Sequence, residues 1–326
     1  MDTKTNQEAI SMVGPATKTY QLSYAFKQQL MQAWRPKPTL KCAITVYAII
    51  GLIFFAIGIS ILVLNDNITE LFYRYDDKCP KIGETCEFTF EVEQDIIAKP
   101  VYFYYQLRGF YQNHRRYIQS ISYEQLRDGV FKNSSEVSSC EPVVYNRDNF
   151  YNISATNKPL DPDQPAFPCG LVARSYFNDT FQLIRMSNIT NVFINDTGIA
   201  WPDDISYKFK NANLDYQWID VTKERFITWI KISPFTDFRK SWGVINEDLT
   251  KGTYKVVIQN NWNATIFEGQ KWIILSQTNT FGGKNEFLAY SYLVVGAISI
   301  ILAIAFVFRK IRRPKGVLDE RIKEFS

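Results

Sequence analysis

Two long apolar runs near the ends of the chain are its strongest hydrophobic pattern. The first is CAITVYAIIGLIFFAIGISILVL, residues 42–64, and the second is FLAYSYLVVGAISIILAIAFVF, residues 287–308. Neither run contains Asp, Glu, Lys or Arg. Because about 20 apolar residues in a helix cross a bilayer, both runs predict transmembrane helices, with buried core helices as the alternative. The first run is longer, and lies farther from the N-terminus, than is expected of a cleaved signal peptide.

The segment between the runs, residues 65–286, has the pattern of β-strands. In EFTFEVE (87–93) the apolar Phe and Val positions alternate with polar ones. Similar stretches are VYFYYQL (101–107), TYKVVIQ (253–259) and KWIILSQ (271–277). Such runs, bounded by turn residues, predict a mainly β, antiparallel sandwich-like domain. Helices are expected to be few, and the helical spacing of apolar residues predicts one at 223–233.

The N-terminal region, residues 1–41, begins with a polar tail and ends with an amphipathic segment. Phe26, Leu30 and Trp34 share one face of a helix predicted over residues 20–34. From Lys18 to Lys41 there are five bases and no acid. This pattern favours contact with an anionic leaflet or with a groove on a partner, and a solvated linker is the alternative.

Charge predicts how the chain is oriented in the membrane. Residues 1–41 hold six Lys or Arg and two acids, and the C-terminal tail, residues 309–326, holds seven and three. The middle segment, residues 65–286, holds 24 bases and 28 acids. Because positively charged flanks stay in the cytoplasm, both termini are predicted to be cytoplasmic and the middle domain extracytoplasmic.

Glycosylation sequons support this orientation. Seven N-x-S/T triplets lie in the middle segment and none in the tails, and such triplets accept N-linked glycans in secretory compartments. Asn67 is expected to lie too near the membrane for modification. The other six are Asn133, Asn152, Asn178, Asn188, Asn195 and Asn263.

The cysteines are divided in the same way, since one lies in the first run and four lie in the middle segment. These four are Cys79, Cys86, Cys140 and Cys169. An even number suits disulfides in an oxidising compartment, and four cysteines allow three pairings. A zinc site is the alternative, but the chain has one histidine and no CxxC spacing.

That histidine, His114, lies in the cluster Asn113, His114, Arg115 and Arg116. A Ser–His–acid site would need it, yet no nucleophile-elbow sequence is present, and no glycine-rich phosphate loop occurs either. We interpret the cluster as structural, with charge-assisted hydrogen bonds that tie loops together; an interaction site is the alternative. No catalytic, metal or cofactor site is predicted.

The two apolar runs offer no path for a solute, because such a path needs polar residues. Their small residues instead permit close helix packing and are predicted to face a partner, with ordinary membrane-span composition as the alternative. They are Gly51, Gly58, Gly296, Ser299 and Ala303.

Several short blocks, in this order and on this topology, resemble the ligand-effect-modulator family. Its members are accessory (β) subunits of phospholipid flippases and pair with type-IV P-type ATPases. The blocks are AFKQQLMQAWRP (25–36), FYQNHRRY (110–117), PCG (168–170), FNDT (177–180), GIAW (198–201), ERFITWIKISPFTDFRK (224–240) and GGKNEFLAYSYLVVG (282–296).

The resemblance implies a non-catalytic subunit. The ATPase partner would bind ATP and magnesium and move phospholipids to the cytoplasmic leaflet, while this chain would support assembly, export from the endoplasmic reticulum and activity. Its membranes would be those of the endoplasmic reticulum, Golgi, endosomes or cell surface. No nucleic-acid partner is expected.

The resemblance also carries expectations for single residues. Family order implies the disulfides Cys79–Cys86 and Cys140–Cys169, although some animal members have six lumenal cysteines where this chain has four. Asn178, in FNDT, ranks first among the glycosylation sites. The main alternative function is a stand-alone, two-span glycosylated receptor or adhesion protein, and a lumenal hydrolase comes third.

Overall fold

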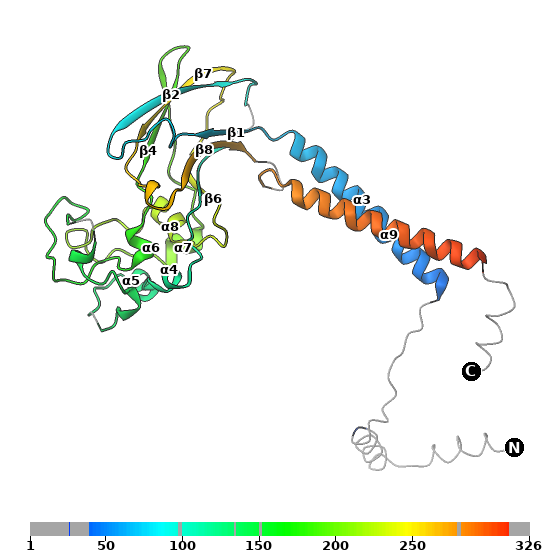
Figure 1. Cartoon of the computed structure of the whole chain (residues 1–326), viewed down its shortest axis with the longest axis horizontal. Coiled ribbons are helices and arrows are strands. Elements are labelled where there is room, and N and C mark those ends of the chain that lie inside the picture. The colour runs from blue at the N-terminus through cyan, green and yellow to red at the C-terminus, as the bar shows by residue number, and fades with distance from the viewer. Residues whose placement is uncertain are drawn as a thin grey trace. The chain divides into compact units, whose positions relative to one another are not determined.

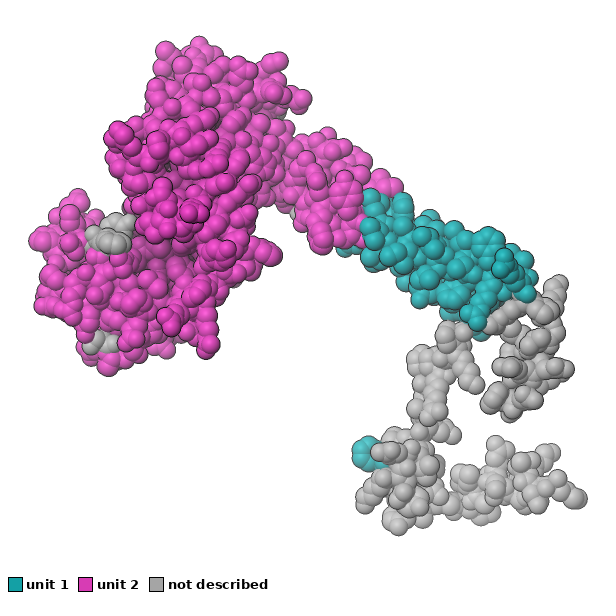
Figure 2. Space-filling model, viewed as in Figure 1, with its two compact units in different colours: residues 1–57, 292–326 teal, residues 58–291 magenta. Residues whose placement is uncertain are grey.

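A computed structural model describes residue 26 and residues 39–96, 100–133, 135–149, 152–278 and 282–312. The chain divides into two compact units (Figure 2), one formed by residues 1–57 and 292–326 and the other by residues 58–291. Within the predicted N-terminal helix, Leu30 and Trp34 lie outside the described residues, and Phe26 is exposed.

Both apolar runs form long helices (Figure 1): α3 covers Leu40–Asp66 and α9 covers Glu286–Arg312. Each has 27 residues, which at 1.5 Å per residue gives about 40 Å, enough to cross a bilayer. Both have the length and composition of membrane spans. Each helix extends beyond the predicted run at both ends, and the last turn of α9 carries Arg309, Lys310 and Arg312.

The small residues of the spans pack against the chain's own helices. A Cβ atom added to Gly51 would lie 2.7 Å from Cγ1 of Ile300 and 3.2 Å from the carbonyl oxygen of Gly296. A Cβ on Gly296 would lie 2.8 Å from Cδ2 of Phe55. Gly51 and Gly296 thus let α3 and α9 approach each other closely, and the contact of these positions with a partner stays a prediction. The other three small residues are also buried within this chain: Gly58, Ser299 and Ala303.

In the part of residues 58–291 that the structure describes, the strands form two four-stranded antiparallel sheets (Figure 1). The first sheet has the order β1 (Glu70–Arg74), β8 (Gln270–Gln277), β3 (Val101–Arg108) and β6 (Phe238–Ile245). The second has the order β2 (Thr85–Val92), β7 (Gly252–Gln259), β4 (Thr180–Arg185) and β5 (Thr190–Val192). This confirms the predicted mainly antiparallel β domain between two spans.

Alternating burial explains how the sheets form one core. Along β3, Val101, Phe103, Tyr105 and Leu107 are buried while the residues between them are partly exposed. Such a strand can pair with neighbours at both edges and still cover a hydrophobic interior. The ring of Phe103 lies 5.2 Å from that of Phe181 in β4, so the two sheets meet through aromatic side chains.

The helices of this unit are short and lie in the loops. They are α4 (Arg115–Gln119), α5 (Tyr123–Asp128), α6 (Leu171–Arg174), α7 (Pro202–Tyr207) and α8 (Glu224–Ile230), with 3-10 turns η1 (Ser138–Cys140), η2 (Asn146–Asp148) and η3 (Thr265–Phe267). The helix predicted at 223–233 is α8. The α-helices gather at one end of the sandwich (Figure 1).

Candidate functional site

The NHRR cluster follows β3 and includes the first two residues of α4, and its side chains face solvent. Asn113, His114, Arg115 and Arg116 are all exposed. Asn113 Nδ2 donates a hydrogen bond to the carbonyl oxygen of Pro234 at 2.8 Å. The histidine and the two arginines form no ion pair with any residue that the structure describes. For these three side chains the structural interpretation stays a prediction, and their exposure also suits its alternative, an interaction site.

Aromatic neighbours of the cluster hold the segment instead. The Phe110 ring lies 5.3 Å from Trp262 and 6.0 Å from Trp229, centroid to centroid. The Tyr117 hydroxyl and Ser175 Oγ are 2.7 Å apart, and burial raises the pKa of Tyr117 well above its ordinary value. Gln112 Oε1 accepts from the Ser233 amide at 3.0 Å. These anchors turn the cationic side chains between them outward.

His114 and Arg116 line an open groove of about 920 Å³ beside α4, η1 and α6. Glu141 is the acid at its wall, and Pro142 and Leu171 supply apolar surface. A groove with the Arg116 guanidinium, the His114 imidazole and apolar surface suits an acidic or hydrogen-bonding segment of a partner.

Large aromatic side chains are exposed in three of the blocks that resemble the family: FYQNHRRY, GIAW and ERFITWIKISPFTDFRK. Tyr111, Trp201 and Phe235 are 62 %, 70 % and 71 % exposed. Tyr111 and Phe235 belong to segments joined by the bonds from Asn113 to Pro234 and from Ser233 to Gln112. Exposed Trp, Tyr and Arg side chains are enriched where proteins bind one another. We take these aromatics and the NHRR cluster together as the candidate contact surface.

Polar contacts fix the position of Trp201. The Glu224 carboxylate accepts three backbone N–H groups, from Gly198 at 3.0 Å, Ile199 at 2.7 Å and Ala200 at 2.8 Å. The Lys231 amine lies 5.3 Å from the centre of the Trp201 ring. The GIAW block is thereby attached to both ends of α8.

The carboxylate of Asp204, on α7, completes this attachment. It is 3 % exposed and pairs with Lys208 at 2.6 Å and with Lys231. Hydrogen bonds from the two lysines lower the pKa of Asp204 below its ordinary value. Lys231 thus joins the C-terminal end of α8 to α7, while Lys208 pairs with Asp204 within the α7 segment.

Lys240 in β6 secures the same end of α8 from inside the domain. Its Nζ donates to the carbonyl oxygens of Thr228 and Trp229 at 3.0 Å each, and to that of Lys231. The last carbonyls of a helix have no intrahelical partner and carry partial negative charge, so an amine stabilises them. Burial lowers the pKa of Lys240 to about 7, and the nearby charge of Lys231 adds to the effect.

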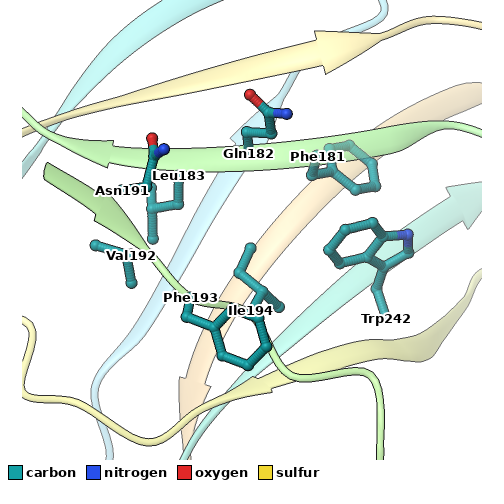
Figure 3. A pocket seen from close by; sticks show the side chains of 8 residues that line it. All are labelled: Phe181, Gln182, Leu183, Asn191, Val192, Phe193, Ile194 and Trp242. Carbon is teal, nitrogen blue, oxygen red and sulfur yellow. The ribbon is translucent and has the colours of Figure 1, made fainter.

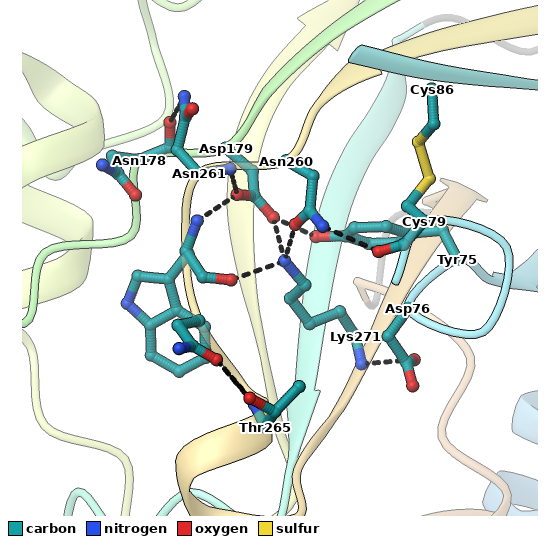
Figure 4. A network of polar contacts seen from close by, with 12 residues as sticks. Tyr75, Asp76, Cys79, Cys86, Asn178, Asp179, Asn260, Asn261, Thr265 and Lys271 are labelled. Carbon is teal, nitrogen blue, oxygen red and sulfur yellow. Dashed lines mark hydrogen bonds and ion pairs between the residues drawn. A yellow bond between two sulfur atoms is a disulfide. The ribbon is translucent and has the colours of Figure 1, made fainter. Parts of the chain in front are cut away.

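A buried network joins the two sheets near the sequon of Asn178 (Figure 4). The Asp179 carboxylate accepts from Lys271 Nζ and Tyr75 Oη, both at 2.7 Å, and from the amides of Asn261 and Trp262, both at 2.6 Å. Burial lowers the pKa of Lys271, and the charge of Asp179 opposes that shift.

Asn260 links this network to a disulfide loop. Its side-chain oxygen accepts from Lys271 Nζ, and its Nδ2 donates to the carbonyls of Cys79 at 2.7 Å and Lys81 at 2.9 Å. Cys79 is bonded to Cys86, and the second disulfide joins Cys140 to Cys169. These are the pairs that the family resemblance implies. Among the described residues, no group of His, Cys, Asp and Glu is arranged to hold a metal ion.

The sequons differ in how their asparagines are held. In three of them the Asn Oδ1 accepts from the threonine hydroxyl two residues later: at 2.6 Å for Asn188, 2.9 Å for Asn195 and 2.7 Å for Asn263. Asn67 instead donates its Nδ2 to the Val63 carbonyl at 3.1 Å. The remaining three are exposed or half-buried: Asn133, Asn152 and Asn178.

Together these features define a class: a membrane protein with two candidate spans that flank a mainly antiparallel β domain. The model of the LEM3 (ligand-effect modulator 3) family / CDC50 family matches residues 61–316. The chain belongs to this family, which confirms the resemblance seen in its motifs.

Three relatives illustrate the match over nearly the full chain. "Putative ALA-interacting subunit 2" of Arabidopsis thaliana is 36 % identical, with 91 % of this chain and 90 % of the relative covered. "ALA-interacting subunit 3" of the same plant is 35 % identical, with 90 % and 87 % covered. "Cell cycle control protein 50A" of Bos taurus is 32 % identical, with 87 % of each chain covered.

Proposed function

We propose that this chain is the non-catalytic accessory subunit of an ATP-driven phospholipid flippase. Membership of the LEM3/CDC50 family supports this role, as do relatives named for interaction with a partner chain. The observation that carries the proposal is the contact surface. Cationic and aromatic side chains are exposed in three family-like blocks, and buried contacts hold each block in place.

In this role the type-IV P-type ATPase partner binds ATP and magnesium and contains the lipid path. The present chain contributes to assembly, to export from the endoplasmic reticulum and to activity. Both termini lie in the cytoplasm, and the sandwich lies on the opposite side of the membrane. The basic flanks and the sequons of the middle segment support this topology.

Co-purification from detergent tests the proposal. The wild-type chain should recover a large ATPase, whereas the double variant Arg115→Glu/Arg116→Glu should recover much less at equal yield of folded chain. Its side chains are exposed, so the charge reversal acts on binding rather than on folding. Lys81→Glu/Lys251→Glu, in exposed loops outside the family-like blocks, is the matched control.

Two outcomes distinguish an error in the candidate contact surface from an error in the proposed function. Full recovery by the double variant would exclude the NHRR cluster from the contact surface. If the wild-type chain recovers no ATPase and remains stable alone, the receptor or adhesion role replaces the flippase role.

A further inference from the structure

A small apolar groove opens where β5 of one sheet comes next to β6 of the other (Figure 3). Its volume is about 390 Å³, within the range of roughly 300–1,000 Å³ for small-ligand sites. Phe181, Val192 and Trp242 contribute apolar surface, while the side chains of Gln182 and Asn191, which alternate with apolar residues along β4 and β5, project from the other side of these strands (Figure 3). A mainly apolar lining is usual in small-ligand sites.

Phe193 lines this groove and is 75 % exposed. A large aromatic ring beside an apolar groove is a costly arrangement in water, and it marks a surface that something covers. The strand that carries the groove, β5, is also the open edge of its sheet. Exposed edge strands promote aggregation unless they are protected.

A modification site lies two residues away. Asn195 begins the sequon completed by Thr197, and its Oδ1 accepts from the Thr197 amide at 3.1 Å and hydroxyl at 2.9 Å. Asn195 Nδ2, the atom that takes a sugar, forms no hydrogen bond with any described residue. The amide of Asn195 donates to the Val244 carbonyl at 2.8 Å, and its carbonyl accepts from the Val244 amide at 2.7 Å. The attachment point therefore has a fixed position.

Gly243 allows this close approach. A Cβ atom there would lie 2.4 Å from Cγ2 of Ile194 and 2.8 Å from the carbonyl oxygen of Asn195. Any side chain at this position would push the sequon away from β6. Phe193 and Asn195 are separated by one residue, so their Cα atoms lie at most about 7 Å apart. A sugar on Asn195 thus starts within reach of the groove.

We propose that the groove seats the N-linked glycan of Asn195. Pyranose rings have C–H faces that pack on aromatic rings, here Phe193, and the apolar side chains of the groove lie beside that ring. The seated sugars cover the apolar surface and the edge of β5. This assignment goes beyond the role as an accessory subunit, and it requires only that the sandwich face the secretory lumen.

Site-resolved deglycosylation of the native full-length chain tests the assignment. Peptide N-glycosidase is added in detergent, and peptide mass spectrometry follows the loss of each glycan. Cleavage at Asn195 should be roughly tenfold slower than at the exposed Asn152, the ratio expected when the seated form outnumbers the free form about ten to one. In the Phe193→Ala variant, the glycan at Asn195 should be cleaved about as fast as the glycan at Asn152.

The control variant is Tyr207→Ala, which removes a ring of similar exposure, 70 %, outside the candidate contact surface and outside every sequon. It should leave the protection of Asn195 intact. Equal rates at Asn195 and Asn152 in the wild type, or a missing glycan at Asn195 while other sequons are occupied, would overturn the assignment alone. The absence of glycans from every sequon would overturn the proposed topology as well.

Discussion

Two basic side chains show how burial decides the role of a single residue. Lys240 is 8 % exposed and donates to three carbonyl oxygens at the end of α8. His114 is exposed, lies at the start of α4 and makes no side-chain capping bond. Lys240 therefore belongs to the frame of the domain, and His114 to its surface.

His114→Ala is expected to change the free energy of unfolding by no more than about 0.5 kcal/mol, because exposed side chains without partners contribute little. Thermal unfolding of the purified chain measures this. If a catalytic role existed, lipid-stimulated ATP hydrolysis per assembled complex would fall although assembly stayed normal. A contact role predicts lower assembly and ordinary hydrolysis per complex.

Lys240 is expected to make stability depend on pH. Its pKa is about 7 in the folded chain, below its ordinary value of 10.5, so the unfolded chain binds more protons between these values. Stability should therefore rise as pH increases from about 7 towards 10, since the folded state favours the neutral amine.

Thermal unfolding of the wild type and of Lys240→Met at pH 6.5, 7.5, 8.5 and 9.5 isolates this contribution. The difference between the two melting temperatures should grow in favour of the wild type as pH rises. A difference that is constant over this range would show that Lys240 keeps its ordinary pKa.

At the scale of elements, the buried pair of Lys271 and Asp179 joins β8 to the segment that leads into β4. The two side chains are 2 % and 0 % exposed, and each has further hydrogen bonds. Removing one partner of such a pair leaves an uncompensated charge inside the protein, which is more costly than losing an exposed pair.

Asp179→Asn is expected to destabilise the domain by roughly 3–5 kcal/mol, because the Lys271 amine loses its counter-charge. The substitution preserves the N-x-T sequon of Asn178, so glycosylation remains available. The unfolding midpoint and the yield of mature chain both report the effect. Asp215→Asn, which breaks the exposed pair with Lys158, is the matched control and should leave the midpoint nearly unchanged.

The sequence predicted those elements in which apolar residues recur at a regular spacing. Residues 87–93, 101–107, 253–259 and 271–277 became β2, β3, β7 and β8 because their apolar residues alternate or form β-branched runs. β5 has three residues, and α4 to α7 have four to six, which is too short for a period to be read. In β6, four consecutive buried residues, Trp242–Ile245, hide the alternation.

The candidate site was predicted only in part, because the sequence does not show which side chains of a short motif are buried and which are exposed. The motif identified the NHRR residues, but the sequence did not show that Phe110 and Tyr117 occupy the interior while the cations face outward. Likewise, small residues on the spans indicated a helix contact, and only the packing of Gly51 on Gly296 showed which helix they meet.

At the scale of the whole molecule, the two disulfides support regions of unequal size. Cys79 and Cys86 are 7 residues apart, whereas Cys140 and Cys169 are 29 apart and close a loop with little regular structure. Cross-links that close longer loops restrict the unfolded chain more.

Replacing Cys140 and Cys169 by serine is expected to cost about 3–4 kcal/mol in the chain-entropy model, against about 2.5 kcal/mol for the shorter loop. Calorimetry of the two paired variants compares these costs. Non-reducing peptide mapping of the wild type checks the pairing, and a Cys79–Cys140 peptide would contradict it.

The strand order also determines when, during synthesis of the chain, each strand can pair with its neighbour. The first three strands pair only with the last three: β1 with β8, β2 with β7, and β3 with β6 and β8. At about 5–20 residues per second, the ribosome needs roughly 10–40 s to travel the 200 or so residues from β1 to β8. β3 gains its first partner with β6, β2 gains β7 next, and β1 waits for β8, so at least one strand edge stays unpaired until β8 is made. A nascent chain that ends before β6 therefore lacks the partner of each of its first three strands, and the sandwich can close only as synthesis approaches the second span.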